Sequence, residues 1–276
     1  ESVYVSERTG DGWSQPKKVE LGETPGMGKR YGEAVASASP DGKSLYIYKG
    51  GQLWSTSVDD PSHKMEKLDK TVNFSDLQNH VCVSPDGNTM FLSSEAEGGR
   101  GGADLYMCEK QSDGSWGAPK SLGHAINTPY DEEGPFVNDN GVLFFASNGL
   151  PGYGGFDIYR TTKINGEWTK PVNLGQPINS PGDDIFFALQ SQSSRGYFAS
   201  ARPGGKGDLD IYKVHYVITD LDDCRPAQDI LAISAMQEPT NPMAYNISLT
   251  VPEDQKTNIR SYAWSVNGKP LAETKE

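Results

Sequence analysis

The sequence predicts an all-β protein built from repeated sheets, and two repeated phrases carry this prediction. The phrase Gly-Gly-x-Asp-[Leu/Ile]-Tyr occurs at Gly101–Tyr106 and again at Gly154–Tyr159. A second phrase, Gly-x-Trp-x-x-Pro-x-x-Leu-Gly, begins at Gly114 and again at Gly166. The period of 52 to 53 residues indicates a repeat architecture.

Each repeat contains short apolar runs separated by turn signals, as in Pro85-Asp86-Gly87. An Asp-Gly pair supplies the backbone conformation that a tight hairpin needs, so each unit is expected to hold four short strands. No such unit buries both faces of its sheet alone. Units stacked radially bury one another, and the sequence therefore predicts a β-propeller.

The units follow one another along the chain and differ in completeness. Ser2-Val3-Tyr4 lies 11 residues before Trp13, and Asp157 lies 11 before Trp168, so the chain is expected to open on the third strand of a unit. In the second unit, Met65 stands where the periodic tryptophan is missing. The strands are expected in 1–22, 31–68, 79–123, 132–175 and 184–214. This predicts about five blades; the alternative is four, with the first strands closing onto the last three.

The repeat ends after Tyr216, and three regions are expected: a propeller at 1–216, a linker at 217–228 and the start of a small β-sandwich-like domain at 229–276. Apolar and polar residues alternate along 245–251, as in a half-buried strand. Asn267-Gly268 is a hairpin signal. The third region thus resembles part of a PKD/immunoglobulin-like or regulatory-like sandwich.

Composition narrows the classes of function. The chain has 25 Lys plus Arg against 37 Asp plus Glu, a formal net charge of −12, which disfavours nucleic-acid binding. No apolar run approaches the ~18 residues of a membrane span. The histidines are scattered, so no metal site and no cofactor are expected. Cys82 and Cys108 are predicted to be buried apolar residues within strands.

The residues that recur with the period are predicted to be structural. A carboxylate that follows a glycine-rich loop caps the backbone N–H groups of that loop; the alternative is a calcium site made of carboxylates and carbonyls. The recurring aromatic residues are expected to form the core between blades. The carboxylates are Asp104, Asp157 and Asp210, and the aromatic residues are Tyr106, Tyr159, Tyr212, Trp116 and Trp168.

The connectors between blades are the candidate binding site. They are expected on one face of the propeller near the channel mouth, where carboxylates from several blades would gather. Such a mouth favours a cationic segment or another protein; the simpler interpretation is a solvated acidic face. The candidate partner-binding residues are Tyr130, Asp131, Glu132, Asp183 and Asp184.

No catalytic residues are predicted, and the protein is expected not to be an enzyme. The sequence contains no Gly-x-Ser-x-Gly nucleophile elbow. A glycosidase needs two carboxylates about 5–10 Å apart, whereas the carboxylates here recur with the repeat. The alternative function is a propeller that binds or cleaves glycans. It would need non-repeating carboxylates and exposed aromatic residues converging on one channel mouth.

The repeats of residues 1–216 resemble the Pro-Asp-Gly (WD-repeat-like, TolB-like) propeller family. The longer phrase, Gly-x-Trp-x-x-Pro-x-x-Leu-Gly-x-x-Ile-Asn-[Thr/Ser], resembles the propeller of OmpA-family envelope lipoproteins from bacteria with type IX secretion. The residues that carry the resemblance are Pro40-Asp41-Gly42, Pro85-Asp86-Gly87, Asp104-Leu105-Tyr106, Asp157-Ile158-Tyr159 and Asp210-Ile211-Tyr212.

The resemblance implies a non-enzymatic periplasmic scaffold at the outer membrane. Its expected partners are other envelope or secretion-system proteins. Peptidoglycan would be bound only through an OmpA-like domain, which this sequence does not contain. The last 50 or so residues depart from the family pattern, because Tyr262–Gly268 resembles a PKD or immunoglobulin-like strand pair.

Overall fold

The computed structural model describes residues 3–10, 12–22, 33–75, 78–190, 195–215, 232–238, 241–250, 265–266 and 269–270. Every regular element in these residues is a β-strand, which confirms the predicted all-β class. Backbone contacts divide the chain into a first unit, 1–174 with 178–217, and a second unit, 175–177 with 218–276.

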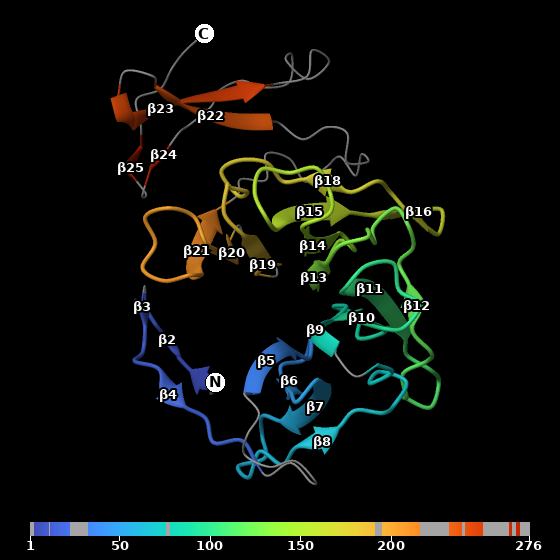
Figure 1. The fold of residues 1–276 in the computed structure, drawn as a ribbon. Helices are drawn as coiled ribbons and strands as arrows, with labels where there is room; N and C mark the ends of the chain where they lie inside the picture. Colours follow the sequence, from blue (N-terminus) through green and yellow to red (C-terminus); the bar gives the residue numbers. More distant parts are fainter. Residues whose placement is uncertain are drawn as a thin grey trace. The chain divides into compact units, whose positions relative to one another are not determined.

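Four antiparallel sheets follow one another in the first unit and form the blades of a β-propeller (Figure 1). Blade 1 contains β5 (Glu33–Ala38), β6 (Ser44–Lys49), β7 (Gln52–Ser57) and β8 (Glu66–Lys67). Blade 2 contains β9 (Gln78–Val83), β10 (Thr89–Ser94), β11 (Asp104–Glu109) and β12 (Lys120–Ser121). Blade 3 contains β13 (Glu132–Val137), β14 (Leu143–Ser147), β15 (Asp157–Thr161) and β18 (Val172–Asn173). Blade 4 contains β19 (Asp184–Leu189), β20 (Arg195–Ser200) and β21 (Asp210–His215).

The strands β5, β9, β13 and β19 are the innermost strands of the four blades (Figure 1). They pack in chain order, β5 beside β9, β9 beside β13 and β13 beside β19. The predicted propeller is therefore confirmed. Four blades are found, which is the alternative count. Among the described strands, the first strands of the chain pair with one another and not with those of blade 4, so the closure on which that alternative depended is not observed.

The N-terminal residues form a small meander with the topology of half a blade. β1 (Tyr4–Val5) pairs with β4 (Lys17–Lys18), and β2 (Arg8–Thr9) pairs with β3 (Gly12–Trp13) inside that loop. In blade 3, β15 pairs with β18 around the inner hairpin of β16 (Lys163–Ile164) and β17 (Glu167–Trp168) in the same way. The chain therefore opens on the third strand of a unit, as predicted.

The Pro-Asp-Gly turns join the first two strands of blades 1 and 2. Gly42 and Gly87 have φ values of 71° and 74°, which L side chains rarely adopt. In the second turn, Asp86 accepts hydrogen bonds from the Ser84 hydroxyl and from the backbone N–H of Asn88. These bonds hold the pKa of Asp86 below its usual value. Local turn chemistry thus sets the register of each hairpin.

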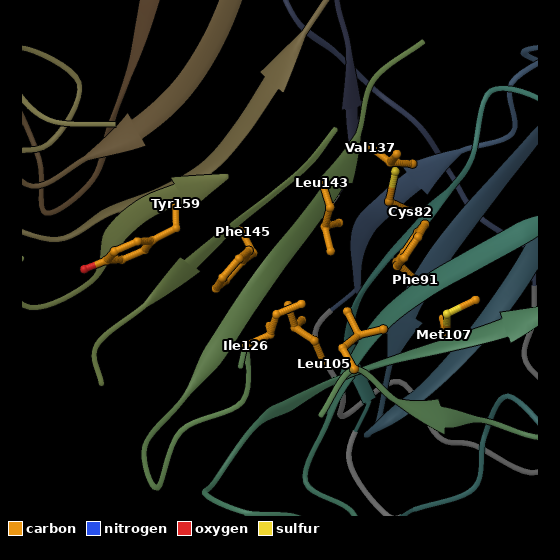
Figure 2. Packing of buried hydrophobic residues seen from close by; sticks show 10 residues of the cluster. Cys82, Phe91, Leu105, Met107, Ile126, Val137, Leu143, Phe145 and Tyr159 are labelled. Carbon is orange, nitrogen blue, oxygen red and sulfur yellow. The ribbon is translucent and has the colours of Figure 1, made fainter. Parts of the chain in front are cut away.

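The hydrophobic core lies between neighbouring blades, as predicted for the recurring aromatic residues. Tyr159 is buried with Leu105 of the preceding blade (Figure 2), and Trp168 packs edge-on against Phe91 at a centroid distance of 5.9 Å. Tyr106, Trp116 and Tyr212 occupy equivalent places in the other clusters, and Met65 fills the place of the missing tryptophan.

Cys82 and Cys108 are buried free thiols within strands, as predicted. Burial raises the pKa of each thiol to about 11, so both are protonated at neutral pH.

The second unit is described only as two strand pairs. β22 (Ala232–Glu238) pairs with β23 (Asn241–Thr250), which covers most of the strand predicted at 245–251. β24 (Ser265–Val266) pairs with β25 (Lys269–Pro270) on either side of the predicted Asn267-Gly268 turn. Cys224 and the expected linker at 217–228 lie outside the described residues, and the three predicted regions stay a prediction.

Candidate functional site at the connector face

The connectors, residues 122–131 and 174–183, run from the outer strand of one blade to the inner strand of the next. They lie against glycine-rich loops, each closed by the recurring aspartate. One carboxylate oxygen of that aspartate accepts hydrogen bonds from two backbone N–H groups of its own loop, as predicted. The donors are Arg100 and Gly101 for Asp104, Tyr153 and Gly154 for Asp157, and Lys206 and Gly207 for Asp210.

The other carboxylate oxygens of Asp104 and Asp157 are buried and accept no hydrogen bond from the described residues. Burial also raises the pKa of Asp157. In the described part of the chain, no group of three or more His, Cys, Asp or Glu side chains is placed to hold a metal ion. The predicted capping role is confirmed, and the calcium alternative stays a prediction.

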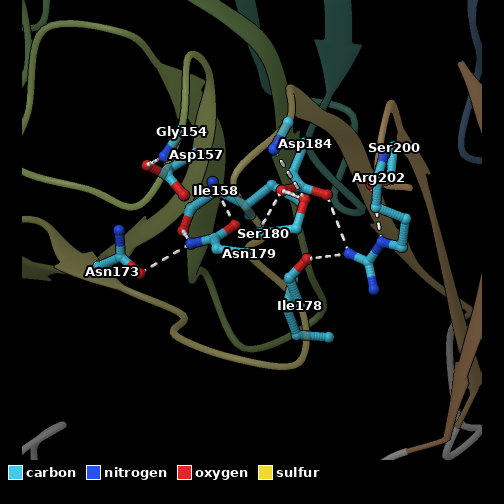
Figure 3. Close-up of polar contacts among 11 residues, drawn as sticks. Gly154, Asp157, Ile158, Asn173, Ile178, Asn179, Ser180, Asp184, Ser200 and Arg202 are labelled. Carbon is cyan, nitrogen blue, oxygen red and sulfur yellow. Dashed lines mark hydrogen bonds and ion pairs between the residues drawn. The ribbon is translucent and has the colours of Figure 1, made fainter. Parts of the chain in front are cut away.

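The asparagine of the Ile-Asn-[Thr/Ser] phrase extends the third strand of its blade. The Asn179 amide accepts a hydrogen bond of 2.8 Å from Ile158 N and donates one of 2.9 Å to Ile158 O (Figure 3). Asn127 makes the same pair of bonds with Leu105. The side chain therefore substitutes for a strand partner, and this explains why the phrase recurs.

The glycine pairs of the loops allow close approach of the next connector. A Cβ at Gly101 would overlap the Tyr130 carbonyl oxygen, and a Cβ at Gly102 would overlap the Asp131 carboxylate. Gly154 and Gly155 stand in the same relation to Gly182 and Asp183. These contacts hold the connector against the preceding blade.

Asp131 and Asp183, both predicted to bind a partner, join neighbouring blades. Asp131 accepts hydrogen bonds from Ala103 N at 3.0 Å and from the Asn148 amide at 3.1 Å. Asp183 accepts one from Phe156 N at 2.9 Å. Both carboxylates remain partly accessible, but their hydrogen bonds fix the loops of the preceding blade.

Glu132 and Asp184 require a correction, because both are fully buried and a partner cannot contact them. Glu132 accepts three hydrogen bonds of 2.7 Å, from the backbone N–H and hydroxyl of Thr128 and from the Ser147 hydroxyl. Burial raises the pKa of Glu132.

Asp184 accepts hydrogen bonds from the backbone N–H and the hydroxyl of Ser180. It also forms an ion pair with Arg202, in which Nη2 lies 2.9 Å from Asp184 Oδ1 (Figure 3). Glu132 and Asp184 are each the first residue of an inner strand, and their side chains point into the protein.

Two exposed tyrosines mark the connector face. Tyr130 is 60% exposed, as a binding residue should be, and Tyr153, which sequence reasoning missed, is 52% exposed. The backbone beneath both is held, since Tyr130 N donates to the Thr128 hydroxyl and Tyr153 N donates to Asp157. A Cβ at Gly149 would lie 3.0 Å from the Tyr130 Cβ, so the two loops touch.

Three further side chains meet where the inner strands begin, and we call His80, Glu133 and Phe186 the axial cluster. His80 Nδ1 lies 3.9 Å from Glu133 Oε2, and the His80 and Phe186 rings are 4.8 Å apart between centroids. The residues come from β9, β13 and β19, each of which has a register shift at this point. Such bulges re-aim side chains and are common beside functional sites.

Phe186 has φ = 59°, a left-handed conformation that costs a bulky residue about 1–2 kcal/mol. Gly134 has the same φ at the equivalent place of blade 3. A Cβ on Gly134 would lie 3.1 Å from the Phe186 ring, so the missing side chain lets the ring reach His80. Alignment of Glu132-Glu133-Gly134 with Asp184-Ile185-Phe186 could have revealed this break in the repeat, which sequence reasoning missed.

Acid is expected to destabilise the protein through His80. Burial lowers the pKa of His80 from 6.5 to about 4, although the Glu133 carboxylate lies near it. Because the pKa is lower in the folded state, the stabilisation is present above about pH 6.5 and is lost as the pH falls to 4. We expect a loss of about 3 kcal/mol in unfolding free energy, measured by urea titration between pH 7 and pH 4.

His80→Gln is the matched variant for that measurement. Its unfolding free energy should fall less over the same range, because it lacks the titrating ring and shares every carboxylate with the parent protein. An identical pH dependence in the two proteins would contradict the assignment to His80.

Comparisons with known proteins found similarity to solved structures only. No family model and no curated protein matches the sequence. A putative TolB from Agrobacterium tumefaciens is 25% identical over 67% of this chain and 58% of its own, with a TM-score of 0.47. TolB from Acinetobacter baumannii is 15% identical over 86% and 54%, with a TM-score of 0.45. A puromycin-hydrolyzing peptidase from Mycobacterium tuberculosis is 16% identical over 98% and 49%, with a TM-score of 0.48. The chain thus spans less than two thirds of each.

The sequence-based prediction that the protein is not an enzyme is contradicted by these comparisons. Besides the mycobacterial peptidase, two structures of a puromycin hydrolase are among the similar proteins. The expectation that the protein is not an enzyme is therefore not retained.

The described residues contain no helix long and apolar enough to cross a membrane.

Proposed function

We propose that the first unit is a protein-interaction module of the bacterial periplasm, held at the outer membrane, and that the connector face is its docking surface. The motif resemblance described above supports the location and the kind of partner, an envelope or secretion-system protein. The proposal extends to the PorE-like lipoproteins of type IX secretion, whose propeller phrase these repeats resemble.

The observation that carries the proposal is the pair of exposed tyrosines, Tyr130 and Tyr153, on loops whose backbone is already fixed. Tyrosine supplies a large amphipathic contact area with little side-chain entropy to lose, and it is enriched at binding hot spots. A rigid loop pays little ordering cost on association. The net charge of −12 favours a partner with a basic surface.

Tyr130→Ala combined with Tyr153→Ala should reduce partner capture at least tenfold. The measurement is a crosslinking pull-down from envelope fractions with the full chain as bait, comparing each captured protein between baits. Tyr4→Ala is the matched control, since Tyr4 is as exposed as Tyr130 but lies in the N-terminal meander. Capture that is equal for the double variant and the control would contradict the proposal.

A glycan-binding or glycan-cleaving propeller is the second candidate. The axial cluster favours it, because Glu133 does not recur in the other blades and Phe186 is an exposed aromatic side chain beside it. A panel of labelled oligosaccharides tests this candidate. If the full chain neither binds nor cleaves any oligosaccharide of the panel, the glycan candidate is excluded.

A further inference from the structure

Blades 1, 2 and 3 are each completed at the outer edge by a segment with the pattern Leu-x-x-x-[Ile/Val]-Asn. The segment directly follows the fourth strand, β8, β12 or β18, which pairs with the third strand of the same blade. The pattern occurs three times in the sequence, at Leu68–Asn73, Leu122–Asn127 and Leu174–Asn179. Each copy therefore serves its own blade.

The three segments make the same contacts with one residue of the third strand. In blade 2, Leu122 N donates to Leu105 O at 3.0 Å, and the Asn127 amide bonds to both N and O of Leu105. Leu122 and Ile126 pack with Leu105 in one buried cluster. Blades 1 and 3 repeat these contacts, to Leu53 and Ile158. The segment thus closes the strand edge and covers an apolar side chain.

Ile211 is the equivalent residue of blade 4, and its place is open. It opposes Ala199 as Ile158 opposes Ala146, and both isoleucines stand within Asp-Ile-Tyr. Among the described strands β21 pairs with β20 alone, and no described asparagine side chain bonds to the Ile211 backbone. The Ile211 side chain is 83% exposed, whereas the equivalent residues are 0% exposed; these are Leu53, Leu105 and Ile158.

β21 is the outermost described strand of blade 4 (Figure 1), and it therefore presents an unpaired edge. Such an edge is a template for pairing with another chain, and extended peptides add a strand to exposed edges in several kinds of recognition. The other three blades show which segment fits. Every copy of that segment in the sequence is already engaged in its own blade, so the occupant of this edge comes from a partner.

We propose that the outer edge of β21 binds an extended segment of a partner protein with the pattern Leu-x-x-x-[Ile/Val]-Asn. The residues before the leucine pair with β21 beside Tyr212, as β12 pairs beside Tyr106. The asparagine amide bonds to N and O of Ile211, and the two apolar side chains of the pattern cover the Ile211 side chain. The inference is independent of the docking surface proposed above, because β21 contains neither Tyr130 nor Tyr153.

The probe for the test is a synthetic peptide with the sequence of residues 116–129, titrated into the isotope-labelled full chain and followed by NMR. The peptide should bind saturably, shift the amide signals of β21 and slow hydrogen exchange of the Ile211 amide. A peptide that carries Asn127→Ala should bind at least tenfold more weakly, because it lacks both hydrogen bonds to the edge. Equal binding of the two peptides, or no saturable binding, would overturn the inference.

Ile211→Lys in the full chain should weaken peptide binding at least tenfold. Its melting temperature should equal that of the parent, because the Ile211 side chain is already exposed. Ile164→Lys is the matched control, since it changes another exposed isoleucine, on β16 of blade 3, and should leave binding unchanged. Binding that Ile211→Lys does not affect would overturn the inference. Signals that move at Leu105 instead of Ile211 would also overturn it, because the peptide would then displace the segment that it copies.

Discussion

Gly154→Ala is expected to lower the unfolding free energy of the first unit by about 3 kcal/mol, the upper range for forced overpacking. The new Cβ would overlap the Gly182 carbonyl oxygen and would lie 2.7 Å from the carbonyl carbon and oxygen of Pro181. These are backbone atoms of a connector that Asp183 fixes through Phe156, so relief requires the blades to separate. Urea unfolding, monitored by tryptophan fluorescence, measures the loss.

Gly207→Ala is the matched control, because Gly207 occupies the same place in the repeat. No described atom lies within 4 Å of a Cβ built there, and its backbone has no left-handed φ. Its substitution should change the unfolding free energy by no more than about 0.5 kcal/mol. Equal losses in the two variants would show that loop conformation, rather than the connector contact, requires glycine.

Arg202→Met is expected to cost about 3 kcal/mol, because it leaves the buried Asp184 carboxylate without its cation. Arg202 Nη2 lies 2.9 Å from Asp184 Oδ1, and the guanidinium also stacks over Phe198 and Tyr212 at 4.9 and 4.8 Å. Methionine keeps most of the side-chain volume, so the main changes are the lost charge pair and the lost hydrogen bonds to Ser200 Oγ and Ile178 O. Thermal and urea unfolding at pH 7 measure the effect.

The double variant Asp184→Asn with Arg202→Met tests whether the unpaired charge of Asp184 causes the loss of stability. It removes the buried carboxylate together with its partner, and it should be more stable than Arg202→Met alone. A double variant that is less stable than either single variant would contradict the assignment, and would indicate that the stacking of Arg202 dominates.

Much of the fold was predictable because its determinants are local. Asp86 and Gly87 form their turn from neighbouring atoms, and Asp157 caps N–H groups three and four residues before it. The alternation of side chains along a strand has a period of two wherever the strand lies. The half-blade at the N-terminus was predicted on the same ground, because the 11 residues from Ser2 to Trp13 match the 11 from Asp157 to Trp168.

The candidate site was predicted only in part, because its members are defined by contacts between blades. Tyr130 was identified and is exposed, but Glu132 and Asp184 were expected at the surface and are buried. Glu132 is the first residue of β13 and its side chain is buried, whereas Asp131, the last residue of the connector, stays partly accessible although both are acidic. Composition alone does not distinguish them.

The sequence by itself determined the blades, their turns and the aromatic residues between them, since each follows from spacing along the chain. Only the tertiary structure decided which side chains of different blades meet. His80 and Phe186 are 106 residues apart in the chain, yet their rings touch because Gly134, on the strand between them, has no side chain in the way. Proximity of this kind depends on the order of the blades around the centre, which no local pattern records.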